Sequence, residues 1–409
     1  MKSDIDRLME DRGLDALIIA ADENYSAALD YLTNGVEITT GLVMKKRGDA
    51  PVMFVNPMET EEAAKSGLTV YSFNDLGWAQ LLLDYKGNRT QAEVVFWGRC
   101  LEKINVPSGK IGIYGVSHLN IILELVRLMG LAYPQYEFVG EMGVSLFDEA
   151  YITKDAEELA RIRSVAERTS HVLQQTWDFI GGHTAQGDTV VKQDGSALTI
   201  GDVKRFVRRA LLDVDLEDTH MIFAQGRDGG FPHSRGEAHE ALKLGQAIVF
   251  DLFPRELGGG YFHDCTRTWS IGYATPEVQA VYDQVMEAFE IAVEMTKIGT
   301  PAKDLQNAVC DYFEAHGHPT SRSVPGTNDG YVHGLGHGIG LNIHERPNLG
   351  VHTQDVLAAG NVITIEPGLY YPDLGYGVRI EDSVLLENTG EVITLTQFHK
   401  DLVLPLKSS

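Results

Sequence analysis

The chain has 409 residues, 44% of them hydrophobic and 22% charged, and its formal net charge is −24. This composition is that of a globular protein, and the length corresponds to two or three domains of roughly 100–200 residues each. The excess of acidic residues argues against a nucleic-acid-binding protein, because such proteins need a basic face.

Cysteine usage and hydropathy restrict the class of protein further. The three cysteines, Cys100, Cys265 and Cys310, show no C-x-x-C spacing, which argues against a disulfide framework and a cysteine zinc site. No apolar run approaches the roughly 20 residues of a membrane span. The first twenty residues lack the apolar core of a signal peptide. We therefore expect a cytoplasmic protein with no membrane partner.

Residues 1–150 are predicted to form a compact α/β domain. Ser3 is expected to cap a short first helix. Alternation of short apolar runs with helical patterns indicates a mixed sheet flanked by helices. The predicted strands are Ala16–Ala20, Gly41–Met44, Val52–Val55, Val94–Trp97 and Lys110–Tyr114, and the predicted helices are Glu59–Lys65 and Leu119–Met129.

Residues 151–409 are predicted to form a second domain whose element order occurs twice. Each copy has a long helix, a second helix and then a pair of strands. The helices are expected at Asp155–Phe179 and Ile200–Leu212, and again at Pro276–Lys297 and Ala302–Ala315. The polar, Gly-containing stretch 181–196 is expected to be a surface loop. Two similar halves that face one another would leave a cleft between them.

The first strand pair carries two acidic residues in an apolar context. Ala247–Phe253 reads AIVFDLF, and in a strand Asp251 points away from Phe250 and Leu252. A buried charge costs several kcal/mol unless it is paired or bound to a metal. A turn returns the chain, so that Asp264 arrives on the next strand. This hairpin thus offers one carboxylate from each strand.

The second strand pair repeats this arrangement with Glu366 in VITIE and Glu381 in VRIED, where Glu381 shares a face with Arg379. Four converging carboxylates would repel one another unless cations neutralise them, and two divalent ions supply the matching charge. Oxygen-rich ligation with one imidazole suits Mn, Co, Fe or Zn. A pair of such metals roughly 3.5–4 Å apart is typical of hydrolytic enzymes.

A Gly-rich segment supplies the imidazoles. Residues 332–347 read VHGLGHGIGLNIHERP, with His333, His337 and His344. The dense glycines disfavour a helix and allow close backbone approach to a ligand. The spacing is not H-E-x-x-H, so a helical zinc-protease site is excluded. Three histidines in so short a segment favour a functional role, and His233 lies upstream in FPHS.

With these blocks in place, residues from about Tyr151 to Leu404 resemble the catalytic domain of the creatinase, prolidase, aminopeptidase P and methionine aminopeptidase superfamily. The resemblance implies the α/β "pita-bread" fold with an internal pseudo-twofold. Residues 1–150 resemble the N-terminal α/β domain of creatinase and prolidase, which methionine aminopeptidases lack. The matching blocks are VFDLF, HDCTRT, HGLGHGIGLNIHERP, ITIEPGLY and VRIED.

The resemblance also implies a metal centre with two divalent ions, Mn foremost and Co, Zn or Fe as alternatives. Asp251 would bind one ion. His337 and Glu366 would bind the other. Asp264 and Glu381 would bridge both, with a hydroxide between the ions.

Further roles are implied for the residues around the metals. Glu366 would transfer a proton to the leaving amine. His233 and His344 would hold the scissile carbonyl and stabilise the tetrahedral intermediate. His333 and Arg379 would lie near the proline-side pocket of a small peptide substrate.

The implied reaction is hydrolysis of the bond before proline in Xaa-Pro dipeptides or Xaa-Pro N-termini, by a homodimer that uses its first domain at the interface. Three alternatives stay open: a metal hydrolase for another small amide or ester, a metal-free creatine amidinohydrolase, and a catalytically silent binding module. The complete set of five ligands argues against the last two. The segments 181–196 and 252–263 are unusual for the family and could border the mouth of the site.

Overall fold

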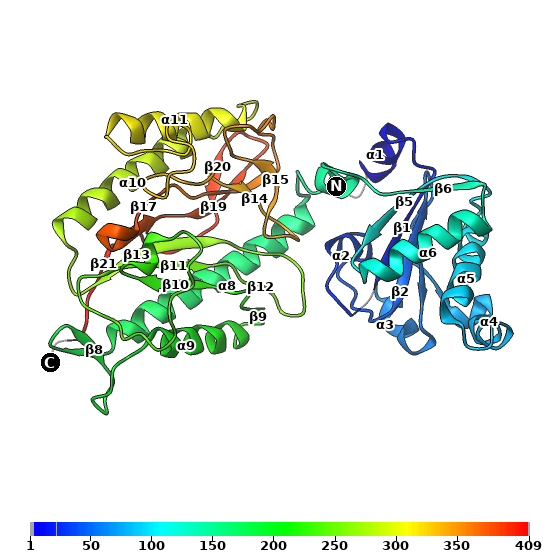
Figure 1. Ribbon diagram of the computed structural model, residues 1–409, viewed down its shortest axis with the longest axis horizontal. Helices are drawn as coiled ribbons and strands as arrows, with labels where there is room; N and C mark the ends of the chain where they lie inside the picture. Colours follow the sequence, from blue (N-terminus) through cyan, green and yellow to red (C-terminus); the bar gives the residue numbers. More distant parts are fainter. Residues whose placement is uncertain (1–3, 22, 408–409) are drawn as a thin grey trace. The chain divides into compact units, whose positions relative to one another are not determined.

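The computed structural model describes residues 4–21 and 23–407, in two compact units, Met1–Tyr151 and Ile152–Ser409 (Figure 1). Ser3, the expected first cap, lies outside the described residues. Helix α1 (Ile5–Asp11) has Asp4 at its N-cap position.

The first unit is built on a six-stranded mixed sheet in the order β4-β3-β2-β1-β5-β6. Helices α5 and α6 pack on one face, against alternate residues of β1 such as Ile18. On the other face, Tyr114 of β5 contacts Phe147 of α7, which contacts Tyr31 of α2. The bounds are β1 Ala16–Ala21, β2 Gly41–Lys46, β3 Val52–Val55, β4 Thr69–Ser72, β5 Gly109–Gly115, β6 Tyr136–Val139, α2 Ala27–Thr33, α3 Thr60–Ala64, α4 Trp78–Asp84, α5 Arg89–Lys103, α6 Leu119–Ala132 and α7 Leu146–Ala150.

One predicted strand of this unit is wrong. Val94–Trp97 lies inside α5, where Phe96, Trp97, Cys100 and Leu101 are buried at helical spacing. A run of four apolar residues fits both a buried strand and a buried helix turn, and only the longer pattern from Arg89 to Lys103 separates the two. The edge strands β4 and β6 were not predicted.

The second unit repeats a helix-helix-sheet order. Helices α8 (Ala156–Gly181) and α9 (Ile200–Leu212) precede a four-stranded sheet, β10-β11-β13-β21. Helices α10 (Pro276–Met295) and α11 (Ala302–Ala315) precede a five-stranded sheet, β15-β14-β16-β19-β20. The bounds are β10 Ile222–Gln225, β11 Ala247–Leu252, β13 Cys265–Ile271, β14 His337–Gly338, β15 Glu345–Asn348, β16 Val362–Ile365, β19 Asp382–Leu386, β20 Val392–Thr394 and β21 Val403–Leu404.

The two unusual segments are partly ordered by strand pairing. Segment 181–196 is not an irregular loop, because it contains the hairpin β7 (Thr184–Gln186) and β8 (Thr189–Val191). In segment 252–263, β12 (Arg255–Glu256) pairs with β9 (Leu216–Glu217). The polar side chains and glycines of each segment predict a turn. They do not predict the short paired strands beside it.

The two sheets of the second unit meet through backbone and hydroxyl contacts. The Glu381 amide donates to the Thr266 carbonyl over 3.0 Å. The Arg379 amide donates to Thr268 Oγ1, which donates to the Arg379 carbonyl, each over 2.9 Å. Arg379 ends β18 (Tyr376–Arg379), which forms a hairpin with β17 (Gly368–Tyr371). This junction brings the acidic ends of the two strand pairs together.

Within residues 4–21 and 23–407, no helix combines the length and apolar character needed to cross a bilayer.

Candidate metal centre

The acidic residues of the two strand pairs lie at or beside strand ends in the second unit. Asp251 is in β11 opposite Thr266 of β13, and Asp264 immediately precedes β13. Glu381 stands between β18 and β19, and Glu366 follows the last residue of β16. Only 5% of Asp264 and 1% of Glu381 is exposed, so each carboxylate is removed from most of its solvation.

Asp264, His337 and Glu381 form the centre of the site. Each offers a ligand atom, and these atoms lie within 4.8 Å of one another. His337 Nδ1 lies 3.0 Å from the Gly338 carbonyl, which can only accept, so this nitrogen carries the proton. The other nitrogen, Nε2, therefore presents its lone pair, as a metal-ligating histidine does.

Glu366 and Asp251 flank this group. His337 Nε2 lies 3.5 Å from Glu366 Oε1 and 3.7 Å from Asp264 Oδ2. Asp251 is not in the three-residue group and is paired with Arg379, whose Nη2 lies 2.5 Å from Asp251 Oδ2. The structure thus places the five predicted ligands in one region. Three of them are close enough to one another to bind the same metal ion.

Unpaired oxygens test whether these residues fit metal ions. Asp251 Oδ1, Asp264 Oδ1 and Glu381 Oε1 are buried and find no hydrogen-bond partner within the described parts of the chain. A buried acceptor without a partner costs roughly 1–3 kcal/mol, and more when it is charged. Three such oxygens beside a free imidazole nitrogen suit hard divalent cations with oxygen and nitrogen ligands, so the donor set fits.

The raised pKa values of the carboxyl groups also indicate that this cluster needs positive charge nearby. Burial, and then the neighbouring carboxylate Glu381, raise the pKa of Asp264 well above its usual range. Burial, and then Glu366, raise the pKa of Glu381 in the same direction. Burial raises the pKa of Glu366 to about 8. Divalent ions would replace the protons that these groups otherwise retain.

Arg379 connects the carboxylate cluster to two residues that the sequence analysis missed. Its Nε donates to Thr266 Oγ1 over 3.1 Å, and Thr266 Oγ1 donates to Glu381 Oε2 over 2.7 Å. Its Nη1 donates to the Tyr370 hydroxyl over 2.8 Å. Thr266 is two residues after Asp264 on the same face of the strand, which is the signal that could have identified it. Tyr370 is the last residue of the block ITIEPGLY, but its contact with Arg379 depends on the β17–β18 hairpin.

The remaining predicted histidines surround the cluster. The ring of His344 lies 4.4 Å from that of His337, centroid to centroid and nearly perpendicular. His333 Nε2 contacts the Tyr370 hydroxyl over 2.9 Å. Burial, and then the charge of His233, lower the pKa of His344. Burial, and then Arg379, lower the pKa of His333 to about 3, and His233 adds a smaller effect in the same direction. His233 and His344 are exposed, whereas burial lowers the pKa of His337 to about 3.

Glycines let the His337 segment approach its neighbours closely. A Cβ at Gly336 would lie 2.1 Å from the Thr364 carbonyl oxygen, and one at Gly338 would lie 2.2 Å from that of Arg346. Real carbon atoms do not approach so closely, so only glycine permits this packing. The close packing fixes the backbone on both sides of His337.

Comparison with known proteins assigns the chain to a family. The model of metallopeptidase family M24 matches residues 160–388. This chain belongs to metallopeptidase family M24. The matched segment contains the ligand candidates described above.

Two curated proteins are similar to this chain. The putative dipeptidase YkvY of Bacillus subtilis is 25% identical over 382 residues, covering 93% of this chain and 96% of that protein. The Xaa-Pro dipeptidase of Pyrococcus furiosus is 38% identical over 177 residues, 43% of this chain and 47% of that protein.

A solved structure similar to this chain shows the fold. The X-Pro aminopeptidase of Thermotoga maritima superposes with a TM-score of 0.75 at 21% identity, covering 96% of this chain and 97% of that one. The expected fold is thereby confirmed: a creatinase/prolidase-like N-terminal α/β unit followed by the pita-bread metallopeptidase unit.

Proposed function

We propose that this family M24 metallopeptidase hydrolyses the peptide bond before proline in Xaa-Pro dipeptides or at Xaa-Pro N-termini. The observation that carries the hydrolytic chemistry is the buried group of Asp264, His337 and Glu381, with carboxylate oxygens that find no hydrogen-bond partner among the described residues. The preference for proline is supported by two proteins similar to this chain, the Xaa-Pro dipeptidase of Pyrococcus furiosus and the X-Pro aminopeptidase of Thermotoga maritima.

The proposed metal ligands are Asp251, Asp264, His337, Glu366 and Glu381, and manganese is the first metal to test. Two divalent ions bound there would activate a water molecule and polarise the scissile carbonyl.

Other residues are proposed to move protons and to hold the substrate. Glu366 lies at the edge of the cluster and is 18% exposed at its side chain, so it can transfer a proton between water and the leaving amine. His344 and His233 are accessible donors for the carbonyl oxygen as charge develops on it. Proline nitrogen carries no N–H, so the leaving group must gain a proton from the enzyme.

Arg379 and His333 are proposed to shape the proline-side pocket. Arg379 is 3% exposed and is bonded to Asp251, Thr266 and Tyr370, so its fork is a fixed support for these groups. His333 is held by the Tyr370 hydroxyl on the same side. Together they place an imidazole ring and a guanidinium beside the carboxylate cluster. This combination suits the proline ring of a substrate and the carboxylate at the end of a dipeptide.

Substrate preference is tested with a peptide panel. Xaa-Pro dipeptides and Xaa-Pro-Yaa tripeptides, with Xaa-Ala peptides as matched controls, are incubated with chelator-treated enzyme after adding back Mn, Co, Zn or Fe. The proposal expects metal-dependent cleavage of the proline peptides that is lost in Asp264→Asn. Cleavage of Xaa-Ala at equal or greater rates would overturn the proline preference. Two bound metals without peptidase activity would favour a different small amide or ester.

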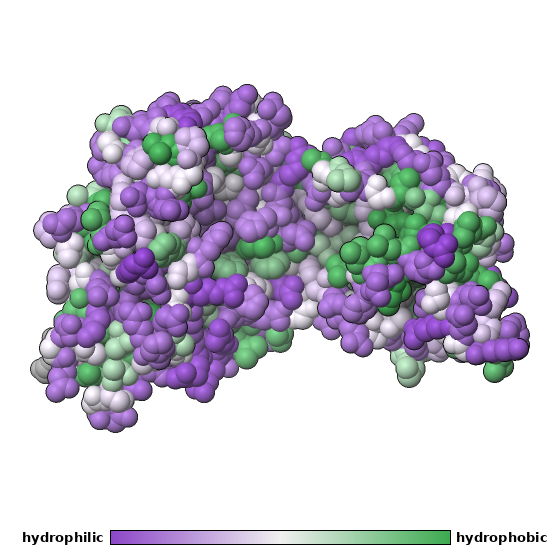
Figure 2. Space-filling view, in the orientation of Figure 1, coloured by the Kyte–Doolittle hydropathy of each residue, from purple (hydrophilic) through white to green (hydrophobic). Residues whose placement is uncertain are grey.

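We further propose a cytoplasmic homodimer. Support for a reducing compartment comes from the three cysteines, which are all free and buried. Support for self-association comes from α6, where Leu119, Leu123 and Leu131 are 73%, 62% and 70% exposed, and Figure 2 shows apolar side chains gathered over this helix. Light scattering that finds a stable monomer would contradict the dimer.

A further inference from the structure

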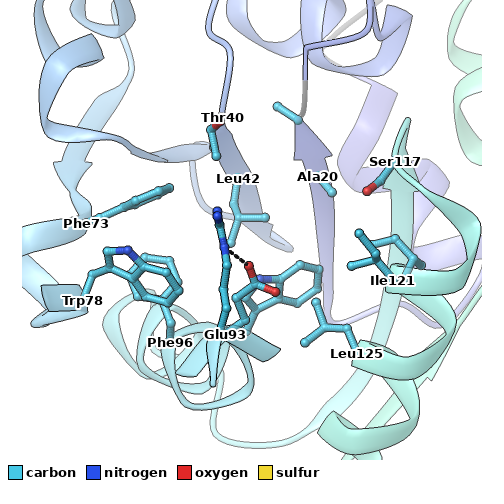
Figure 3. A pocket seen from close by; sticks show the side chains of 15 residues that line it. Ala20, Thr40, Leu42, Phe73, Trp78, Glu93, Phe96, Ser117, Ile121 and Leu125 are labelled. Carbon is cyan, nitrogen blue, oxygen red and sulfur yellow. Dashed lines mark hydrogen bonds and ion pairs between the residues drawn. The ribbon is translucent and has the colours of Figure 1, made fainter. Parts of the chain in front are cut away.

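The first unit contains a cavity whose lining includes none of the proposed metal ligands. Its volume is about 120 Å³, and Figure 3 shows it between the ends of β1 and β2 and helices α5 and α6. This volume is of the same order as that of an apolar cavity of about 150 Å³, which holds one benzene ring, so the cavity has the scale of a single side chain.

The cavity occupies a recognised position in an open α/β sheet. Strands β1 and β5 are parallel neighbours, and the chain leaves β1 for α2 and β5 for α6. These two helices cover opposite faces of the sheet, so a crevice opens where the connections diverge. Ala20 and Ala21 of β1, Ser117 after β5 and Ile121 of α6 line the cavity. Ligands of open α/β sheets bind at such a point, outside the carboxyl ends of the strands.

One wall of the cavity is aromatic. Phe73, Trp78 and Phe96 pack edge to face, with centroids 4.9 Å apart for Phe73–Phe96 and 5.4 Å for Trp78–Phe96. Figure 3 shows this group on one side of the cavity, opposite Ile121 and Leu125. Phe73 and Phe96 are 9% and 3% exposed, so their surfaces are already fixed by the core. Such a preformed apolar pocket with a few polar groups is the usual form of a small-molecule site.

Two opposite charges stand at the cavity. Arg89 and Glu93 line it from successive turns of α5, and their ion pair of 3.1 Å is the dashed line in Figure 3. The Arg89 side chain is 70% exposed and that of Glu93 is 24% exposed. An exposed pair at this spacing contributes little, so a ligand with both charges can replace it at small cost. The hydroxyl residues Thr40 and Ser117 complete the polar part of the lining.

We propose that this cavity binds a free amino acid with an apolar or aromatic side chain. The side chain enters between the Phe73–Trp78–Phe96 group and α6, the carboxylate pairs with Arg89, and the ammonium pairs with Glu93. Charge complementarity selects a zwitterion over a simple hydrocarbon, and the cavity volume selects one side chain over a longer peptide. The site belongs to the unit without metal ligands, so it does not depend on the proposed peptidase activity.

The test measures binding of L-phenylalanine to the full-length protein by calorimetry and by the fluorescence of Trp78 and Trp97. Saturable, roughly millimolar binding is expected, because the charges at the mouth remain partly hydrated. Arg89→Met and Glu93→Gln should each weaken it at least about fivefold. Arg7→Met is the matched control, since Arg7 forms an exposed i,i+4 pair with Asp11 in the same unit but does not line the cavity. It should bind phenylalanine like the parent.

Ligand analogues test the chemical class. Glycine lacks the side chain, and 3-phenylpropionate lacks the ammonium, so both are expected to bind more weakly than phenylalanine. Any binding at the metal centre is common to the parent and Arg89→Met, and therefore cancels in the comparison. The proposal is overturned if phenylalanine does not bind saturably, if Arg89→Met binds it like the parent, or if either analogue binds as tightly.

Discussion

Arg379 donates from Nη2 to Asp251 Oδ2 over 2.5 Å, and this pair joins a residue of the second strand pair to a residue of the first. The bond fixes one oxygen of Asp251, whereas Oδ1 finds no hydrogen-bond partner in the part of the chain that the structure describes. Because Nε and Nη1 are held by Thr266 and Tyr370, the guanidinium cannot rotate freely. Arg379 therefore orients the carboxylate that is expected to bind metal.

Replacement of Arg379 by methionine should lower metal affinity or kcat/KM by roughly 10–100-fold, as expected for loss of a group that orients a ligand. Arg379→Lys should recover little, since an ammonium cannot reproduce the planar fork. Metal titration and steady-state kinetics measure both effects. Arg163→Met, which removes an exposed arginine paired with Glu387, is the control. Normal metal binding and activity in Arg379→Met would contradict this role.

Thr266→Val should weaken metal binding by roughly tenfold, with the fold retained. The exchange conserves shape but removes the hydroxyl that donates to Glu381 Oε2 and accepts from Arg379 Nε. Thr169→Val serves as the control, because Thr169 is equally buried but donates within its own helix to Val165. Equal metal affinity in the two variants, measured by titration, would show that the Thr266 hydroxyl does not position Glu381.

The contrast between Asp264 and Thr266 shows what the sequence can predict about this site. The sequence predicts a role for Asp264 because a carboxylate among apolar residues needs a partner, which is a local property of the chain. Thr266 gives no such signal, since a threonine in a strand is ordinary. Its role arises only when β18 is brought against β13, a contact between segments more than a hundred residues apart.

The fold shows the same division between local and distant information. Helices α9 and α11 were predicted at the residues where they occur, because their apolar periodicity is long and unbroken. The strand predicted at Val94–Trp97 is wrong because four apolar residues carry too little periodicity to distinguish a strand from a helix. The edge strands β4 and β6 have polar or half-buried residues, and only pairing with β3 and β5 makes them strands.

The metal-free protein should lose stability as the pH rises from about 6.5 to 8. Burial raises the pKa of Glu366 to about 8 and raises that of Asp264 and Glu381, so the folded state holds protons that the unfolded chain has released. Stability falls with pH wherever the folded state binds more protons, by at most about 1.4 kcal/mol per pH unit for each group. Below about pH 6.5, buried neutral His337 contributes with the opposite sign, because the unfolded histidine gains a proton.

Denaturant midpoints at several pH values, with chelator and with added manganese, measure this dependence. Bound metal keeps its ligands deprotonated, so the fall in stability should disappear or reverse when manganese is present. Glu366→Gln removes one titrating group and should give a shallower slope in chelator. A metal-free slope that is flat or rises over this window would exclude the proposed protonation of the cluster.

Substitutions of His344 and His337 should have different effects, one on catalysis and the other on metal binding, although the two rings lie only 4.4 Å apart. His344→Ala should lower kcat by roughly 10²–10³-fold while metal content stays normal, because His344 is proposed to stabilise developing charge. His337→Ala should lose metal, since its Nε2 faces Asp264 and Glu366. Metal analysis beside kinetics distinguishes the two. Metal loss in His344→Ala would make that residue a ligand or its support.

Gly336→Ala should destabilise the protein, whereas Gly334→Ala should be nearly neutral. A Cβ at Gly336 would lie 2.1 Å from the Thr364 carbonyl oxygen, but at Gly334 the nearest atom is 3.6 Å away, an ordinary contact. Forcing a methyl group into the first position should cost about 1–3 kcal/mol, because backbone must move. The same displacement would shift His337, so metal affinity should fall together with the unfolding midpoint. Equal unfolding midpoints and equal metal affinity in the two variants would show that the segment can relax without moving its histidine.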